Sequence, residues 1–96
     1  MAIQSFGDKL TETFFVYGQT KKGIGWLRLK SIVRRKLDMI HYAAKLRDLS
    51  SPPGNMLEAL KGKWSGYYSI RINDQWRVVF QWGPNGPQQV WVTDYH

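Results

Sequence analysis

The spacing of hydrophobic residues changes once along this chain, and that change limits the folds it can adopt. Between Trp26 and Ala44 hydrophobic residues recur every three or four positions, and from Tyr68 onward they recur every second position. The first spacing is typical of an amphipathic helix and the second of half-buried strands. The stretch "SSPPGN" separates the two patterns, because proline cannot continue a helix. The sequence therefore predicts an α+β fold, with helices first and strands after them.

Two helices are predicted in the first half of the chain. Asp8 is a suitable N-cap for a short helix that ends near Gly18. A longer helix carries one continuous hydrophobic stripe, made of Trp26, Leu29, Val33, Leu37, Ile40 and Ala44. His41 lies off this stripe, so we expect a solvated side chain there. The segment "IQSF" near the N-terminus is a possible short strand.

Three strands are predicted in the second half, each with one hydrophobic face. The residues of these faces are Tyr68, Ile70, Ile72, Trp76, Val78, Phe80, Trp82, Val90 and Val92. The stretch "GPNGP" is a turn between the last two strands. Successive strands with short loops form an antiparallel meander. We therefore expect two N-terminal helices packed on one face of a mainly antiparallel sheet, in a single domain spanning residues 1–96.

The register of the first predicted hairpin follows from the hydrophobic pattern. With Asn73, Asp74 and Gln75 as the loop, every hydrophobic residue of the two strands lies on one face. Arg71 and Arg77 are then directly opposed on the other face, where like charges destabilise a cross-strand pair. An anion such as a phosphate, bound by both guanidinium groups, would relieve this repulsion. Alternatively, both side chains extend into solvent at a cost below ~1 kcal/mol.

The chain ends on "DYH", and the second hairpin brings this end to the two arginines. Arg77 faces Thr93 or Tyr95, depending on the register, and in both cases Tyr95 shares the face of the arginines. Lys61, in "ALKGK", can add another positive charge at the edge of the sheet. An acid, a phenol, an imidazole and several cations around one phosphate can position a phosphodiester and transfer protons.

The charge of the chain favours a polyanionic partner. It has 14 basic and 7 acidic residues, a formal net charge of +7, and an aromatic content of 15%. Both features are typical of nucleic-acid binding. Trp91, on the face of the arginines, is placed either to stack on a base or to cover the sheet edge.

The residue types also bear on the class of chemistry. Cysteine is absent, the two histidines are far apart, and carboxylates are few. These features argue against a zinc site and against two-metal phosphoryl chemistry. Cleavage without a metal would favour RNA, whose 2′-hydroxyl can act as the internal nucleophile. Neither a signal peptide nor a hydrophobic segment of membrane-spanning length is visible, so we expect a cytoplasmic protein.

The chain resembles the HigB-type toxins of bacterial toxin–antitoxin systems, in the RelE superfamily. The resemblance is carried by "LKG", "SIRIN", "WR" and the final "DYH", which occur together and in that order. With the N-terminal "IQSF" and the two predicted helices, it covers nearly the whole chain. It implies a RelE-like fold and a toxin that enters the ribosomal A site and cuts mRNA there, without a cofactor. It also implies neutralisation by a helix-turn-helix antitoxin of the HigA type, which would provide the only link to DNA.

The resemblance also assigns residues to the site. By position they are Lys61 near the scissile phosphate, Arg77 on the phosphate, and the C-terminal trio Asp94, Tyr95 and His96. Glu58 stands where some relatives have a histidine. Proton transfer therefore falls either to Glu58 or to His96 and Asp94. The further candidates for binding RNA are Arg71, Lys63 and Trp91.

Two other classes of function remain open from the sequence. One is a basic module that occupies the ribosome or RNA without cutting. The other is a protein-interaction domain whose cations meet an acidic partner. A passive RNA binder has little use for "DYH", and a protein-interaction domain should keep its affinity at salt concentrations that abolish RNA contact.

Overall fold

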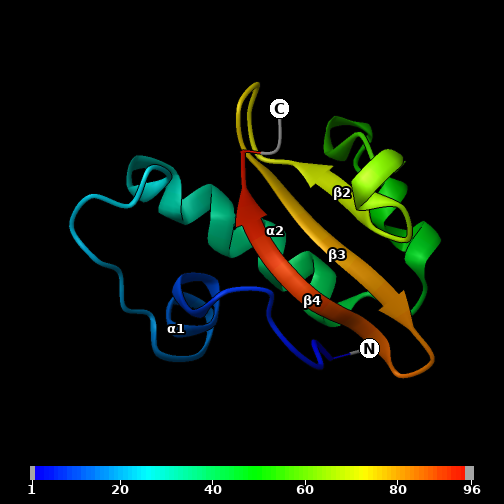
Figure 1. Ribbon diagram of the computed structural model, residues 1–96, viewed down its shortest axis with the longest axis horizontal. Coiled ribbons are helices and arrows are strands. Elements are labelled where there is room, and N and C mark those ends of the chain that lie inside the picture. Colours follow the sequence, from blue (N-terminus) through cyan, green and yellow to red (C-terminus); the bar gives the residue numbers. More distant parts are fainter. Residues whose placement is uncertain (1, 95–96) are drawn as a thin grey trace.

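A four-stranded antiparallel sheet forms the centre of the molecule. The computed structural model describes residues 2–94, and its strands lie in the order β1-β2-β3-β4 (Figure 1). Their bounds are β1 Glu58–Ala59, β2 Tyr68–Arg71, β3 Arg77–Gly83 and β4 Gly86–Thr93. The last three are the predicted meander. β1 was not predicted, because two residues are too few to show a period.

Two α-helices precede the sheet in the chain. α1, Lys9–Tyr17, begins at the predicted cap, where the Asp8 carboxylate accepts a hydrogen bond from the Thr11 amide at 3.0 Å. It ends at Gly18, which is left-handed with φ of 70°. The longer predicted helix is divided, since it begins as a short 3₁₀ helix and continues as α2. The remaining helices are η1 Leu27–Leu29, α2 Lys30–Tyr42, η2 Leu46–Ser50, η3 Pro53–Asn55 and η4 Gly62–Trp64.

The two α-helices are placed differently against the sheet. α2 crosses behind β3 and β4 and contacts both, whereas α1 lies beside β4 (Figure 1). The expectation of two N-terminal helices on one face is therefore only partly correct. α1 alone is N-terminal, α2 reaches towards the middle of the chain, and the 3₁₀ helices η3 and η4 adjoin the strands. A mixed fold with an antiparallel sheet and two α-helices is what the structure has.

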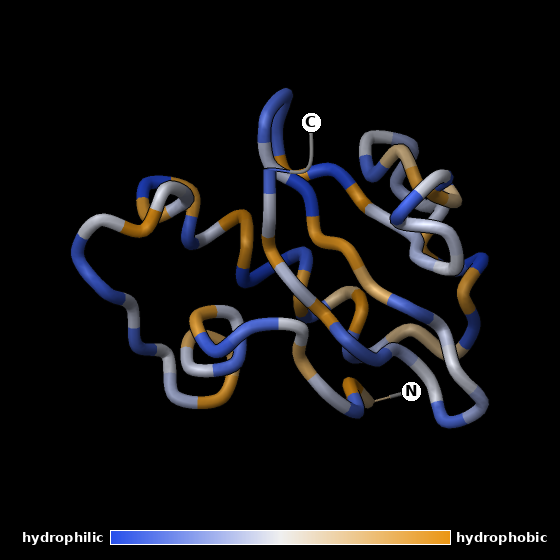
Figure 2. Tube along the Cα trace, viewed as in Figure 1, coloured by the Kyte–Doolittle hydropathy of each residue, from blue (hydrophilic) through white to orange (hydrophobic). Residues whose placement is uncertain are grey.

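The hydrophobic core lies between α2 and the sheet. Its buried members from the helices include Phe14, Val33, Leu37 and Ile40, and those from the strands include Ile70, Val78, Phe80, Val90 and Val92. Hydrophobic residues occupy the middle of β3 and β4, while the tip of the β2–β3 hairpin is hydrophilic (Figure 2). The inward positions predicted from the period of two are thus confirmed.

The predicted register of the first hairpin is confirmed. Ile70 pairs with Val78, and Arg71 pairs with Arg77. In the second hairpin Arg77 pairs with Thr93, which decides between the two registers left open by the sequence. The register shifts between Val79 and Gln81, so this hairpin contains an irregularity that the hydrophobic pattern did not predict.

The N-terminal segment covers the free edge of β4. Phe6 forms a parallel bridge with Val90, and the Thr11 hydroxyl accepts a hydrogen bond from the Val92 amide at 3.1 Å. These contacts satisfy backbone groups that an edge strand would otherwise expose. His41 takes part in the same arrangement, because its Nδ1 accepts a hydrogen bond from the Ile3 amide at 3.2 Å. The expectation of a solvated His41 was therefore wrong.

Among residues 2–94, none of the helices has the length and hydrophobicity needed to cross a membrane.

Candidate functional site

One face of the sheet, which we call the outer face, carries four of the candidate residues that the structure describes. It is the face opposite the core positions Ile70 and Val78. Two rows of paired residues cross it. The first row is Glu58, Ser69, Val79 and Trp91, and the second is Arg71, Arg77 and Thr93. Because the rows lie two residues apart along each strand, they are neighbours on the same face, roughly 7 Å apart.

Arg77 is held at the centre of the outer face by three oxygen atoms. Its Nη1 donates to Ser69 Oγ at 3.1 Å and to the carbonyl oxygen of Met56 at 3.4 Å. The same nitrogen lies 3.5 Å from Glu58 Oε1, and only 14% of the Arg77 side chain is exposed. The guanidinium group is therefore fixed in place and not free to move in solvent, which suits recognition of a phosphate in one orientation.

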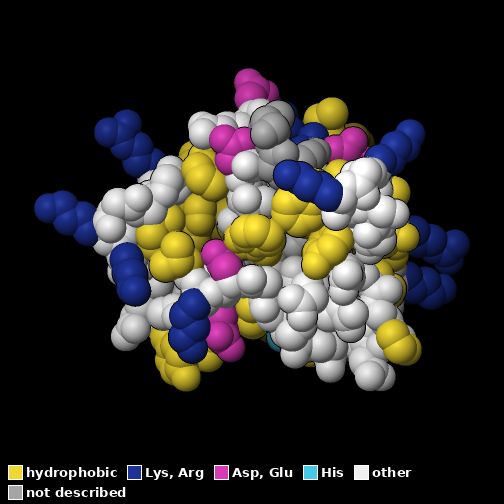
Figure 3. Space-filling model, in the orientation of Figure 1, with side chains coloured by type: hydrophobic (Ala, Val, Ile, Leu, Met, Phe, Trp, Pro, Cys, Tyr) yellow, Lys and Arg dark blue, Asp and Glu magenta, His cyan; other side chains and the backbone are white. Residues whose placement is uncertain are grey.

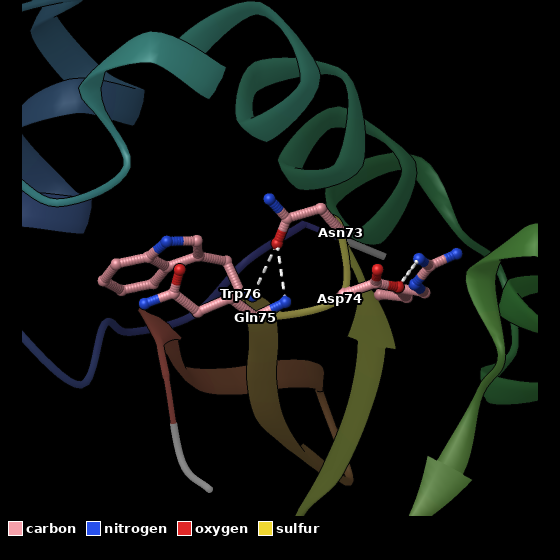
Figure 4. A network of polar contacts seen from close by, with 5 residues as sticks. Asn73, Asp74, Gln75 and Trp76 are labelled. Atoms are coloured by element: carbon pink, nitrogen blue, oxygen red, sulfur yellow. Dashed lines mark hydrogen bonds and ion pairs between the residues drawn. The ribbon is translucent and has the colours of Figure 1, made fainter.

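Arg71 has a different and weaker partner. It forms an ion pair with Asp74 in the β2–β3 hairpin loop, and Asp74 is labelled in Figure 4. The Asp74 side chain is 99% exposed. Each arginine is thus paired with its own carboxylate, which relieves the repulsion between Arg71 and Arg77 from within the chain. An exposed pair of this kind contributes little and exchanges easily for another anion.

The hairpin loop also holds the end of β4. Asn73 Oδ1 accepts hydrogen bonds from the amides of Gln75 at 2.9 Å and Trp76 at 2.7 Å (Figure 4). The loop is closed in this way, and the side chain of Gln75 donates from Nε2 to Asp94 Oδ2 at 3.1 Å. Asp94 therefore lies next to the row of the arginines. Tyr95 and His96, also predicted for the site, lie outside the residues that the structure describes.

The contact between Gln75 and Asp94 follows from the register of the second hairpin, which the sequence alone leaves open. Pairing of Arg77 with Thr93 places Trp76 next to Asp94, so Gln75, one residue earlier, comes within reach of the same carboxylate. The hydrophobic pattern predicts Gln75 only as part of the hairpin loop. Ser69 was likewise missed, although it stands two residues before Arg71 on the same face. Both residues position other groups through hydrogen bonds.

The two lysines predicted for the site lie on the β1 side of the sheet. Lys61 precedes η4 and Lys63 lies within it, and both side chains are exposed. Trp91 is only partly exposed, and its ring lies 5.5 Å from that of Trp64. Trp91 thus packs against Trp64 on the outer face.

A third cation near Arg71 was missed altogether. Lys36 of α2 is only 6% exposed, and its ammonium group donates to the buried side-chain oxygen of Asn55. Burial, followed by the charges of Arg35 and Arg71, holds the pKa of Lys36 below its ordinary value of 10.5. Lys36 lies three residues after Val33, on the edge of the hydrophobic stripe, which is the signal that could have found it.

The outer face is a mixed surface. Hydrophobic side chains occupy its middle and most of the basic side chains project around its margin (Figure 3). Within residues 2–94 there is no enclosed pocket and no group of three side chains suited to hold a metal ion. In the described part the candidate residues are therefore spread over an open surface.

A model of a known protein family matches residues 4–96, and its description is a RelE-like toxin of the type II toxin–antitoxin system HigB. The chain belongs to this HigB-like toxin family. Toxin HigB-1 of Vibrio cholerae is 38% identical over 82 residues, which cover 85% of this chain and 84% of that protein. An uncharacterised protein of Haemophilus influenzae is 39% identical over 92 residues, covering 96% of this chain and 90% of its own length.

A solved structure supports the fold of this HigB-like toxin. A YoeB/ParE toxin from Agrobacterium tumefaciens superposes with a TM-score of 0.51 at 21% identity, over 96% of this chain and 92% of that one. At this identity the likeness concerns the fold alone. As a member of a type II toxin family the protein is the toxin component of a toxin–antitoxin system, and the family implies an antitoxin as its partner.

Proposed function

We propose that this HigB-like toxin is an mRNA endoribonuclease that cuts on the ribosome, in the A site, and thereby stops translation. One observation supports this most directly. Arg71 and Arg77 are paired across β2 and β3, Glu58 lies beside Arg77 on the same face, and Asp94 follows the end of the adjacent strand and is bound to the hairpin loop. Cations for a phosphate and acids for proton transfer are thus brought together from distant parts of the sequence.

The proposed chemistry uses the RNA as its own nucleophile. A base takes the proton of the 2′-hydroxyl, the 2′-oxygen attacks the adjacent phosphorus, and the 5′-oxygen of the next nucleotide leaves with a proton. Such a reaction gives a cyclic phosphate and a free 5′-hydroxyl and requires no metal. Arg77, Arg71 and Lys61 would stabilise the charge on the phosphate, and Lys63 would contact the backbone of the RNA.

The proton transfers are assigned to two carboxylates and one imidazole. Glu58 or Asp94 would serve as the base, and His96 would donate to the leaving oxygen, since an imidazole titrates near neutral pH. Tyr95 would orient the substrate. Glu58 lies 3.5 Å from Arg77 and is therefore close to any phosphate that Arg77 holds.

The proposal includes partners and location. The antitoxin would be a helix-turn-helix protein of the HigA type, so that contact with DNA is made only through it. The toxin would act in the cytoplasm, where ribosomes are found. A basic surface with a formal net charge of +7 is suited to approach the ribosome by electrostatic attraction.

The test is cleavage of a defined mRNA with and without ribosomes. Purified toxin is added to ribosomes stalled with one codon in the A site, and the 5′ ends of the RNA fragments are mapped by primer extension. We expect a cut within the A-site codon, and little cutting of the same RNA when ribosomes are omitted. If the toxin instead binds these ribosomes and leaves every mRNA intact, the protein is a non-catalytic binder and the proposal is wrong.

A further inference from the structure

The outer face carries an aromatic cluster beside the arginines. Trp64 of η4 lies 5.4 Å from Tyr67 and 5.5 Å from Trp91 of β4, measured between ring centroids. All three side chains are partly exposed. Val79, which pairs with Trp91, is fully buried but is not part of the main core. The cluster is therefore a second hydrophobic patch on the sheet, separate from the core against α2.

The position of this cluster relates it to the candidate phosphate site. Trp91 is in the row next to the one formed by Arg71, Arg77 and Thr93. The separation of the rows, roughly 7 Å, is one that a single nucleotide spans. A phosphate bound at Arg77 would therefore place a base of the same or the adjacent nucleotide within reach of Trp91.

Two lysines are neighbours of Trp64 along the chain. Lys61 and Lys63, at the start of η4, are both exposed. Exposed aromatic rings in a surface that also carries cations suit a chain of phosphates and bases, because the cations attract the phosphates and the ring faces accept the bases. The planes of Trp64 and Trp91 are 48° apart, so a base that stacks on one ring meets the other at an angle.

We propose that Trp64 and Trp91 form a stacking surface for one nucleobase of the RNA, next to the phosphate held by Arg77 and Arg71. This inference rests on the proposed function, because it names how the same site holds its substrate. Trp64 is the new residue in it. Stacking on aromatic side chains accepts every base, so the surface contributes affinity and position without selecting a sequence.

The test combines a protein variant with a modified substrate. Wild type and Trp64→Leu are compared on ribosome-bound mRNA, with a series of substrates that each carry one abasic nucleotide near the cleavage site. On intact mRNA we expect Trp64→Leu to cut about 5- to 150-fold less efficiently, the factor that loss of one stacked base produces. One abasic substrate should reduce wild-type cleavage by a similar factor, and on that substrate wild type and variant should cut equally.

Matched controls separate stacking from folding. Trp64→Phe keeps an aromatic ring and should retain most of the activity. Trp82→Leu removes a tryptophan that packs against the main core. Any reduction in its cleavage efficiency should therefore be the same on intact and abasic RNA. Thermal unfolding of every variant is measured beside wild type. If Trp64→Leu does not fold, Trp91→Leu is compared on the same substrates.

Two results would overturn the inference. In the first, the cleavage efficiency of Trp64→Leu is lower than that of wild type by the same factor on every abasic substrate as on intact RNA. This would mean that the cluster only stabilises the sheet. In the second, the variant cuts normally but escapes its antitoxin, which means that the patch binds protein. Failure of wild type to cut on the ribosome is a different outcome, since it contradicts the proposed function itself.

Discussion

Arg71 and Arg77 face each other across β2 and β3, and each is paired with a different carboxylate. Arg77 is mostly buried and held by Glu58, Ser69 and the Met56 carbonyl, whereas Arg71 is paired with the fully exposed Asp74. The two cations therefore differ in how readily they accept a new anion. Arg77 is already oriented, whereas Arg71 would have to exchange Asp74 for a phosphate in the proposed site.

Removing the partner of Arg71 should strengthen RNA binding. We expect Asp74→Asn to lower the dissociation constant for a short RNA by up to about fivefold, because an exposed ion pair competes only weakly with the phosphate. The measurement is a titration at several salt concentrations. Asp38→Asn is the matched control, since it changes the net charge equally but removes a partner of Arg34 on α2. Weaker binding by Asp74→Asn would contradict the exchange.

Glu58 should matter for the rate and not for the fold. The Glu58→Gln variant loses a carboxylate that is 48% exposed and paired with Arg77, so the free energy of unfolding should change by less than ~1 kcal/mol. If Glu58 transfers a proton, single-turnover cleavage should fall about 10²- to 10⁴-fold. Glu12→Gln, which breaks a pair with Lys9 on α1, is the control. A Glu58→Gln variant that cuts at the wild-type rate would assign the proton transfer to the C-terminal residues.

The hydrogen bond between Gln75 and Asp94 should position the end of the chain. We expect Gln75→Ala to reduce the cleavage rate about 2- to 13-fold while the affinity for the ribosome stays unchanged, because one hydrogen bond contributes about 0.5–1.5 kcal/mol. Asp94→Asn keeps an oxygen that can accept from Gln75 but removes the charge. A much larger rate loss in Asp94→Asn than in Gln75→Ala would show that the carboxylate has a chemical role beyond its position. Equal rates for Gln75→Ala and wild type would show that the contact positions nothing.

Lys36 should make the stability depend on pH in the alkaline range. Its pKa is lowered in the folded protein, so between that pKa and the ordinary 10.5 the unfolded chain binds more protons. The contribution of Lys36 to the free energy of unfolding therefore rises with pH between these two pKa values and is constant at lower pH. Urea unfolding of wild type and Lys36→Met from neutral pH to about 10.5 measures the difference. The control is Lys30→Met, which removes an exposed lysine of the same helix and should show the pH dependence of wild type. A Lys36→Met variant that also shows the wild-type pH dependence would contradict this prediction.

Much of the fold was predictable because its elements repeat a simple pattern. The register of the first hairpin followed from hydrophobic alternation, since a shift by one residue would have moved Ile70 and Val78 to the outer face. β1 could not be found in the same way. It is short and is defined by its pairing with β2, where Glu58 faces Ser69, and such a partner cannot be read from local sequence.

The candidate site was predictable in outline but not in its contacts. The predicted register indicated that Arg71 and Arg77 face each other. It did not indicate which carboxylates would relieve the repulsion between them. Glu58 lies far from Arg77 in the sequence, and nothing local indicates that they meet. Lys36 shows the same limit, because its buried partner Asn55 lies in η3, beyond the end of the helix that carries the lysine. Long-range contacts between polar side chains depend on packing that a periodicity does not describe.

We propose that Arg77 binds and stabilises the scissile phosphate on the ribosome. The most direct measurement is single-turnover cleavage of mRNA in the A site by wild type, Arg77→Ala and Arg28→Ala. Arg28→Ala is the control, because Arg28 is an exposed arginine of η1. Ribosome binding and thermal unfolding of each protein are measured in parallel. We expect Arg77→Ala to remain folded, to bind the ribosome and to cut about 10²- to 10³-fold more slowly, while Arg28→Ala cuts nearly as fast as wild type. A folded Arg77→Ala variant that cuts at the wild-type rate would contradict the account.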